Sequence, residues 1–278
     1  MSRIEDILEK ATRLRNGDAL PEGAINIPLQ PVAPEVFKIE QKLIVENPYL
    51  VTVTDSGSPI AEEYKKLKSL ILKLTNAGGF KNTLMVTSTM GGEGKSITAT
   101  NLAITLAQEY DHTVLLVDAD LRKPSISGYL GIQPQIGLTD CLTKGVDVSD
   151  ALIKTGIGKL VILPAGSRIE NPVELFSSNR MQTFINELKQ RYPDRYVIFD
   201  TPPVLSFADA HSLGLVVDGV IFVVKEGGAA LNNVKDALNI LKDTNVLGVV
   251  FNNVELSRFD SHYSYYTYNT NYYYSVRK

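Results

Sequence analysis

The chain has 278 residues, 44% of them hydrophobic, and carries a formal net charge of −3. That length and apolar content are enough for one large core, arranged in one or two domains. The slightly acidic balance leaves no basic surface of the kind that binds nucleic acid, so no nucleic-acid partner is expected.

The sequence predicts neither a disulfide within the chain nor a membrane-spanning helix. Cys141 is the single cysteine, so no disulfide can form within the chain and a reducing compartment is expected. The longest apolar stretch, residues 213–224, is interrupted by Asp218, whereas a membrane-spanning helix needs about 20 apolar residues. We therefore expect a soluble protein of the cytoplasm.

The first 57 residues contain a helix signal and then a proline-rich stretch. Ser2 and Glu5 form a capping-box pattern ahead of apolar residues that recur on one helical face, which predicts a short amphipathic helix. Residues 16–58 contain several prolines and little periodicity, which predicts an extended linker. Residues 1–57 are therefore expected to form a separate N-terminal region.

An α/β domain with a doubly wound, mainly parallel sheet is expected over residues 58–256. Ser58 as N-cap and Pro59 at the first helical position open a helix that ends at Asn76. Beyond it, apolar runs rich in β-branched residues alternate with helical patterns, which indicates a parallel sheet covered on both faces. The expected strands are 84–87, 114–117, 160–163, 196–199, 220–224 and 247–251, and the helices between them include 96–110, 179–192 and 230–244.

A phosphate-binding loop follows the first of these strands. Residues 88–96 read Ser-Thr-Met-Gly-Gly-Glu-Gly-Lys-Ser and open a predicted helix. Successive N–H groups of such a loop wrap phosphates, Lys95 reaches the outer phosphates, and the Ser96 hydroxyl ligates Mg²⁺. Thr89 stands where the consensus has its first glycine. The loop nevertheless favours a nucleotide site over a glycine-rich turn.

Aspartates end two of the apolar strands. The strand 114–117 runs into Asp118-Ala-Asp120-Leu-Arg122, and the strand 196–199 runs into Asp200-Thr-Pro-Pro. Carboxylates at this edge of a sheet can hold a metal ion and accept a proton. Any one of them could instead cap the following helix. Three beside a phosphate loop favour a catalytic site.

The C-terminal segment, residues 257–278, is rich in tyrosine and lacks strand or helix periodicity. It reads as a solvated tail, although on its own it is equally compatible with a segment that self-associates or forms an edge strand. Beside a phosphate loop, it suggests an enzyme joined to its own substrate. The candidate phosphate acceptors are Tyr263, Tyr265, Tyr266, Tyr268, Tyr272, Tyr273 and Tyr274.

In order and spacing, these motifs resemble the bacterial tyrosine kinases, which are P-loop enzymes of exopolysaccharide and capsule systems with a deviant Walker motif and a MinD-like fold. The stretches 137–140, 163–166, 171–175 and 248–252 are similar too. The N-terminal region resembles that of stand-alone kinases from exosortase-associated polysaccharide clusters.

The resemblance implies roles for the site residues, with ATP and Mg²⁺ as cofactors. Asp118 would ligate Mg²⁺ and act as base, Ser96 and Asp200 would complete the metal site, and the tail tyrosines would be phosphorylated. Lys95, Asp120 and Arg122 would also take part in catalysis. The nucleotide-binding residues would be Gly91, Gly92, Glu93, Gly94, Lys95, Ser96, Ile97 and Asn252. A transmembrane polysaccharide co-polymerase, the chain-length regulator, would activate the enzyme and recruit it to the inner face of the membrane.

The chain departs from the family pattern at two places. Gly91 stands where the family often has proline, which loosens the loop without removing an N–H donor. Glu62, Lys65 and Lys68 occupy the positions of an oligomerisation motif, Glu-x-x-Arg-x-x-Arg, but lysine lacks the planar fork of arginine. A homo-oligomer is therefore possible, and the alternative is a solvated helix face with one i,i+3 ion pair.

Two other functions compete with the kinase. A partitioning or positioning ATPase shares the fold and uses nucleotide-driven dimerisation, but its loop begins with a lysine where this chain has Met90. A non-catalytic adaptor could bind partners through the aromatic tail. The complete set of Lys95, Ser96, Asp118 and Asp200 argues against an adaptor.

Overall fold

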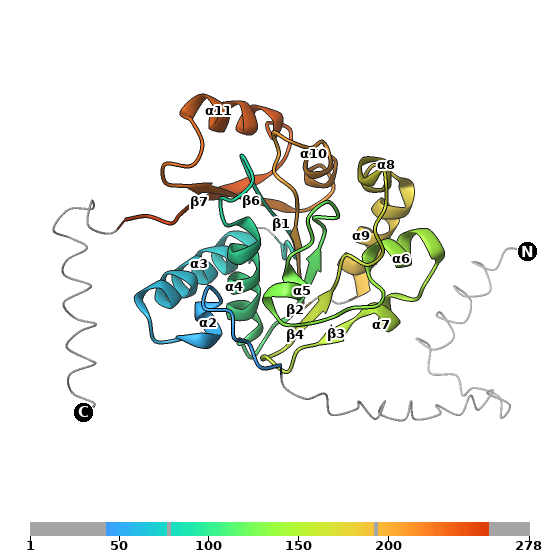
Figure 1. The fold of residues 1–278 in the computed structure, drawn as a ribbon, viewed down its shortest axis with the longest axis horizontal. Helices are drawn as coiled ribbons and strands as arrows, with labels where there is room; N and C mark the ends of the chain where they lie inside the picture. Colours follow the sequence, from blue (N-terminus) through green and yellow to red (C-terminus); the bar gives the residue numbers. More distant parts are fainter. Residues whose placement is uncertain (1–42, 77–78, 192–193, 256–278) are drawn as a thin grey trace, which may run out of the picture. The chain divides into compact units, whose positions relative to one another are not determined.

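A seven-stranded sheet forms the centre of the domain, in the order β3-β4-β2-β5-β1-β6-β7 (Figure 1). The structure is a computed structural model that describes residues 43–76, 79–191 and 194–255. Neighbouring strands pair in parallel except β3, which is antiparallel to β4. The strands are β1 Thr83–Ser88, β2 Thr113–Asp118, β3 Ile153–Lys154, β4 Leu160–Leu163, β5 Arg195–Asp200, β6 Gly219–Lys225 and β7 Val246–Asn252.

Helices cover both faces of this sheet and enclose two hydrophobic cores. One core lies under α2, α3, α4 and α5, and the other lies under α6 to α11. The first group is α2 Val51–Thr54, α3 Pro59–Asn76, α4 Lys95–Ala107 and α5 Ile126–Tyr129. The second group is α6 Leu138–Lys144, α7 Val148–Ala151, α8 Pro172–Phe176, α9 Asn179–Arg191, α10 Asp209–Gly214 and α11 Leu231–Ile240.

The central strands are apolar on both sides because each side faces a core. Leu84 and Val86 of β1 are buried in the core under α4, whereas Met85 is buried in the opposite core. The prediction of a doubly wound, mainly parallel sheet is confirmed. Within the described ranges, no helix is both long enough and apolar enough to cross a membrane.

Helix α3 begins as its sequence predicts. The Ser58 hydroxyl accepts a hydrogen bond from the Ala61 N–H at 3.2 Å, and Pro59 is the first helical residue. That bond satisfies one of the donors that a helix N-terminus leaves without a partner. The helix ends at Asn76, followed by Gly79 with a φ of +114°.

The part of the predicted linker that the structure describes is folded against the domain. Leu50 is fully buried in the core under α4. The Asn101 side chain on α4 accepts hydrogen bonds from the N–H and hydroxyl of Thr52, at 3.1 and 2.9 Å, and donates one to the Tyr49 carbonyl at 2.9 Å. The prediction of an extended linker is therefore wrong for residues 43–57. The predicted N-terminal helix lies outside the described residues.

Candidate active site

The phosphate-binding loop joins β1 to α4 and needs glycine at two positions. Gly92 and Gly94 have φ values of +86° and +89°, a region that residues with a side chain rarely adopt. A Cβ at Gly94 would lie 2.1 Å from Nδ2 of Asn252. That amide nitrogen instead donates to the Glu93 carbonyl at 2.9 Å. The end of β7 therefore packs directly against the loop, which brings Asn252 to the place where the sequence predicts nucleotide binding.

Glu93 stabilises the loop from within. Its buried carboxylate accepts hydrogen bonds from the Met90 N–H at 2.7 Å and from the Lys225 N–H at 3.4 Å. The sequence analysis places Glu93 among the nucleotide-binding residues. In the structure its side chain binds the protein backbone and connects the loop to the end of β6.

The predicted catalytic carboxylates meet at the ends of two adjacent strands. Asp118 ends β2, Asp200 ends β5, and the two residues are paired in register. Both side chains are completely buried. Oδ2 of Asp118 accepts hydrogen bonds from the N–H groups of Ser125 and Ile126, at 3.0 and 3.1 Å. Oδ1 of Asp118 and Oδ2 of Asp200 have no hydrogen-bond partner among the described residues.

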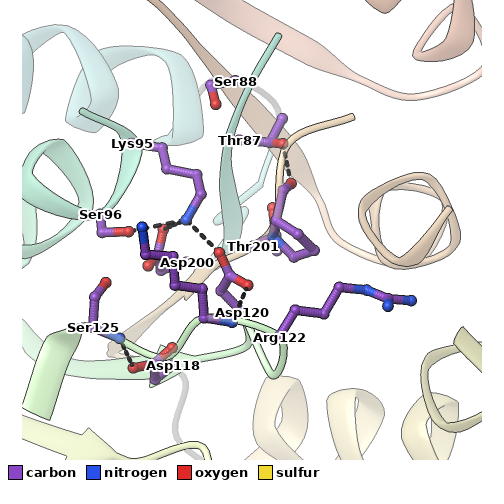
Figure 2. A network of polar contacts seen from close by, with 12 residues as sticks. Thr87, Ser88, Lys95, Ser96, Asp118, Asp120, Arg122, Ser125, Asp200 and Thr201 are labelled. Carbon is purple, nitrogen blue, oxygen red and sulfur yellow. Dashed lines mark hydrogen bonds and ion pairs between the residues drawn. The ribbon is translucent and has the colours of Figure 1, made fainter. Parts of the chain in front are cut away.

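Lys95 joins two of the site carboxylates, those of Asp120 and Asp200, to the phosphate-binding loop (Figure 2). Its ammonium lies 2.7 Å from a carboxylate oxygen of Asp120 and 3.5 Å from one of Asp200, and it donates to the Ser96 hydroxyl at 3.0 Å. The structure thus gathers Lys95, Ser96, Asp118, Asp120 and Asp200, as the sequence predicts. Their grouping results from three parallel strands that end at one edge of the sheet.

Burial and mutual repulsion alter the protonation of these groups. Desolvation, with the nearby charge of Asp200, raises the pKa of Asp118 to about 7. Desolvation also raises the pKa of Asp200, to about 6, although the Lys95 ammonium opposes that rise. Burial favours neutral Lys95, but Asp200 and Asp120 outweigh it and raise the pKa of Lys95. Lys95 therefore keeps its charge, while Asp118 can exchange a proton near neutral pH.

The oxygen atoms of the site fit a magnesium ion that is held together with a nucleotide. Two buried carboxylate oxygens without partners, on Asp118 and Asp200, lie at the strand ends beside the loop that carries the Ser96 hydroxyl. Mg²⁺ prefers such hard oxygen ligands, and it keeps positions for water and substrate phosphates. No cluster of three or more His, Cys, Asp or Glu side chains in the described ranges could hold a metal by itself.

Arg122, predicted to be catalytic, lies outside this group. Figure 2 shows its side chain extending away from Lys95. Its Nε and Nη2 donate to the two carboxylate oxygens of Asp209, at 2.8 and 3.3 Å. The guanidinium carbon also lies 4.3 Å from the centroid of the Phe207 ring. The sequence analysis missed Asp209 and Phe207. The only sequence signal for Asp209 is that it is an acidic residue at the start of a short helix after the strand that ends at Asp200.

Comparison with known proteins agrees with this geometry. A family model described as an AAA domain matches residues 81–248. Tyrosine-protein kinase YwqD of Bacillus subtilis (strain 168) is 36% identical over 220 residues, which cover 78% of this chain and 90% of YwqD. The chain belongs to the bacterial tyrosine-protein kinases.

Solved structures separate this kinase from other members of its fold. The crystal structure of the chimerical protein CapA2B2 matches with a TM-score of 0.69 at 29% identity, and the match covers 77% of the kinase and 94% of that chain. The septum site-determining protein MinD from Pyrococcus horikoshii OT3, complexed with Mg-ADP, matches with a TM-score of 0.52 at 26% identity over 61% of the kinase and 69% of that chain. The prediction of a MinD-like P-loop fold is thus confirmed, and this fold implies that the chain binds a nucleotide.

The predicted oligomerisation residues of the kinase make ion pairs within the chain. Glu62 and Lys65 form an i,i+3 pair at 2.9 Å on the exposed side of α3. Lys68 pairs with Glu109, just beyond the end of α4. The Glu62–Lys65 pair agrees with a solvated helix face, whereas the Lys68 side chain is only 18% exposed and pairs with a residue outside α3. The role of the three residues in assembly stays a prediction. The seven tail tyrosines lie outside the described residues.

Proposed function

We propose that the protein is an ATP-dependent tyrosine autokinase that phosphorylates the tyrosine cluster of its own tail, residues 263–274. The observation that carries this proposal is the position of Asp118, a buried carboxyl group at the end of β2, paired in register with Asp200, which forms an ion pair with Lys95 of the phosphate-binding loop. Phosphoryl transfer to a hydroxyl requires a proton acceptor and groups that position the phosphates and neutralise their charge.

Transfer to tyrosine depends on a base. The phenol has a pKa near 10 and is a poor nucleophile at neutral pH, so a carboxylate must accept its proton as the bond to phosphorus forms. Asp118 is suited to this task because Oδ1 has no hydrogen-bond partner in the described part of the chain, whereas Oδ2 is held by two backbone N–H groups. Those two bonds fix the orientation of the carboxyl group.

Charge neutralisation is the second requirement. The phosphoryl group carries developing negative charge in a loose transition state, and positioned cations stabilise it. Lys95 stays protonated and stands at the N-terminus of α4, where the helix dipole adds positive potential. Bound Mg²⁺ would neutralise charge on the phosphates, with Ser96, Asp118 and Asp200 as its protein ligands.

The alternative function is nucleotide hydrolysis without protein phosphorylation, as in a positioning ATPase. One measurement separates the two: the intact mass of the purified full chain after incubation with Mg-ATP. Autokinase activity adds discrete steps of one phosphate that map to residues 263–274, and Asp118→Asn abolishes them. ATP consumption without any gain in mass would instead establish the ATPase.

We place this activity in exopolysaccharide production or export, with a transmembrane polysaccharide co-polymerase as the activating partner at the inner face of the membrane. The support is the resemblance to kinases of such systems. The test is fractionation of cells that contain or lack the co-polymerase. Loss of the kinase from the membrane fraction in its absence is expected, and an unchanged distribution contradicts recruitment.

A further inference from the structure

We propose that Arg122 is a positioning residue that clamps together the two loops that follow the strands ending at Asp118 and Asp200, through its ion pair with Asp209. The inference rests on the proposed kinase function. It differs from the role expected from sequence, since Arg122 touches none of Lys95, Asp118 or Asp200.

The clamp connects segments that leave neighbouring strands. Arg122 lies four residues beyond Asp118 on the loop that follows β2, and Asp209 begins α10 after the loop that follows β5 and Asp200. At their roots the two loops are joined by a hydrogen bond of 2.9 Å from the Ala119 N–H to the Asp200 carbonyl. The Arg122–Asp209 pair provides a second connection farther from the sheet.

The geometry of this pair is that of a strong interaction. The side chain of Asp209 is only 1% exposed and that of Arg122 is 31% exposed, so most of the contact is shielded from solvent. Two nitrogens of the guanidinium bind the two oxygens of the carboxylate, an arrangement that lysine cannot reproduce. The Phe207 ring, 4.3 Å from the guanidinium carbon, fixes the orientation of the arginine from the Asp200 loop itself.

The site needs such a clamp because its carboxylates repel one another. Asp118 and Asp200 end adjacent strands, which lie about 4.8 Å apart in a sheet. Each raises the free energy of the other in its ionised form, and this repulsion favours movement of the two strand ends away from each other. A buried ion pair that spans the same loops opposes that movement without adding its own charge to the site.

Nucleotide binding depends on a different part of the fold. The phosphate-binding loop is carried by β1 and α4 and is held by Glu93 and Asn252. None of these contacts involves Arg122 or Asp209. Loss of the clamp should therefore impair phosphoryl transfer and metal binding much more than it impairs binding of the nucleotide.

The test compares Arg122→Ala, Arg122→Lys and Asp209→Asn with the unaltered full chain. We expect kcat for autophosphorylation to fall about tenfold to a hundredfold in Arg122→Ala, with a smaller fall in Arg122→Lys. The Kd for ADP should stay within about twofold. The double variant Arg122→Ala/Asp209→Asn should lose no more kcat than the single variants, because the two residues act as one unit.

Lys144→Ala is the matched control. Lys144 also pairs with an aspartate whose side chain is 1% exposed, Asp140, on a helix that carries no catalytic carboxylate. This control should lower the thermal midpoint without a change in kcat. The proposed clamp would be contradicted if Arg122→Ala kept its kcat, or lost kcat only in proportion to its loss of ADP affinity.

A second measurement needs no kinase activity. For the unaltered chain, ADP with Mg²⁺ should raise the thermal midpoint more than ADP alone, because Asp118 and Asp200 hold the ion. In Arg122→Ala the increment due to Mg²⁺ should disappear while the shift from ADP alone remains. A full increment in that variant contradicts the clamp even if no tyrosine is phosphorylated. Failure of the unaltered chain to gain phosphate contradicts only the proposed autokinase function.

Discussion

Asp118 and Asp200 lie directly opposite each other at the ends of adjacent parallel strands, and each has a buried oxygen that no group in the described residues hydrogen-bonds. Unsatisfied carboxylate oxygens in a protein interior are costly, since desolvation is not offset by a partner. This edge of the sheet is therefore a place where the chain gives up stability. A metal ion bound together with the nucleotide would supply the missing partners.

The stability of the nucleotide-free chain should depend on the ionisation of Asp118. Its pKa is raised from about 4 in the unfolded chain to about 7 in the folded one. Its stabilising contribution is thus complete below about pH 4 and is lost as pH rises through 7. In urea unfolding without Mg²⁺, Asp118→Asn should lose less stability between pH 5 and pH 8 than the unaltered chain. At pH 8 we expect it to be more stable by about 1–3 kcal/mol. Equal losses in both proteins contradict the burial of an ionised Asp118.

Replacing Lys95 should remove activity while keeping the fold. Lys95→Met deletes the cation that pairs with Asp120 and Asp200, so phosphoryl transfer should fall by about two orders of magnitude or more. Intact mass after incubation with Mg-ATP measures the transfer, and circular dichroism checks the fold. Lys144→Met, which removes a lysine from another buried aspartate, serves as the control. Phosphorylated tyrosine in the purified Lys95→Met protein would rule out Lys95 as a catalytic group.

The contribution of α3 to assembly can be tested with two neighbouring ion pairs. Glu62–Lys65 and Glu63–Lys66 are both i,i+3 pairs with half-exposed side chains, so each contributes only a few tenths of a kcal/mol to the helix. If the motif that begins at Glu62 bridges subunits, Glu62→Lys should reduce the particle mass by light scattering, whereas Glu63→Lys should not. Equal masses for both variants and the unaltered chain would return Glu62 to the solvated-face interpretation.

Phosphorylation of the tail should loosen any assembly. Each phosphate adds about −1.5 to −2 charges at neutral pH, so modification of all seven tyrosines would add on the order of −10 to a chain at −3. We expect the particle mass to fall as the phosphate count rises, and the effect to weaken as salt screens the repulsion. A fully phosphorylated chain that assembles at low salt as well as the unmodified chain contradicts an assembly switch. The tail would then be a substrate or partner signal alone.

Much of the fold follows from local sequence patterns. The predicted strand 114–117 lies inside β2, and the predicted start of α3 at Ser58 and Pro59 is confirmed by its cap. Both depend on nearest neighbours in the sequence: a run of apolar residues and a hydroxyl before a proline. Strand β3 and the short helices α5, α7 and α8 are too brief for any periodicity to develop, and tertiary contacts determine them instead.

The candidate site was predictable to the extent that strand ends determine it. Lys95, Asp118 and Asp200 each follow directly from a strand or loop pattern, and parallel strands bring them to one edge. Arg122 shows what sequence cannot provide. The family resemblance implied a catalytic role for it, but the direction of its side chain is decided by Asp209, 87 residues farther along the chain. A side chain's orientation depends on partners that only the fold brings near.

The packing of residues 49–52 against helix α4 determines where the domain can be cut. A recombinant fragment that begins at residue 58 would lose Leu50 from the core, at a cost of about 1.5–3 kcal/mol. It would also remove three of the hydrogen bonds of Asn101, a side chain buried in the helix that the phosphate-binding loop precedes. Excision at the start of α3 therefore damages the scaffold of the nucleotide site. A fragment for crystallography or inhibitor screening should retain residue 43 and everything after it up to α3.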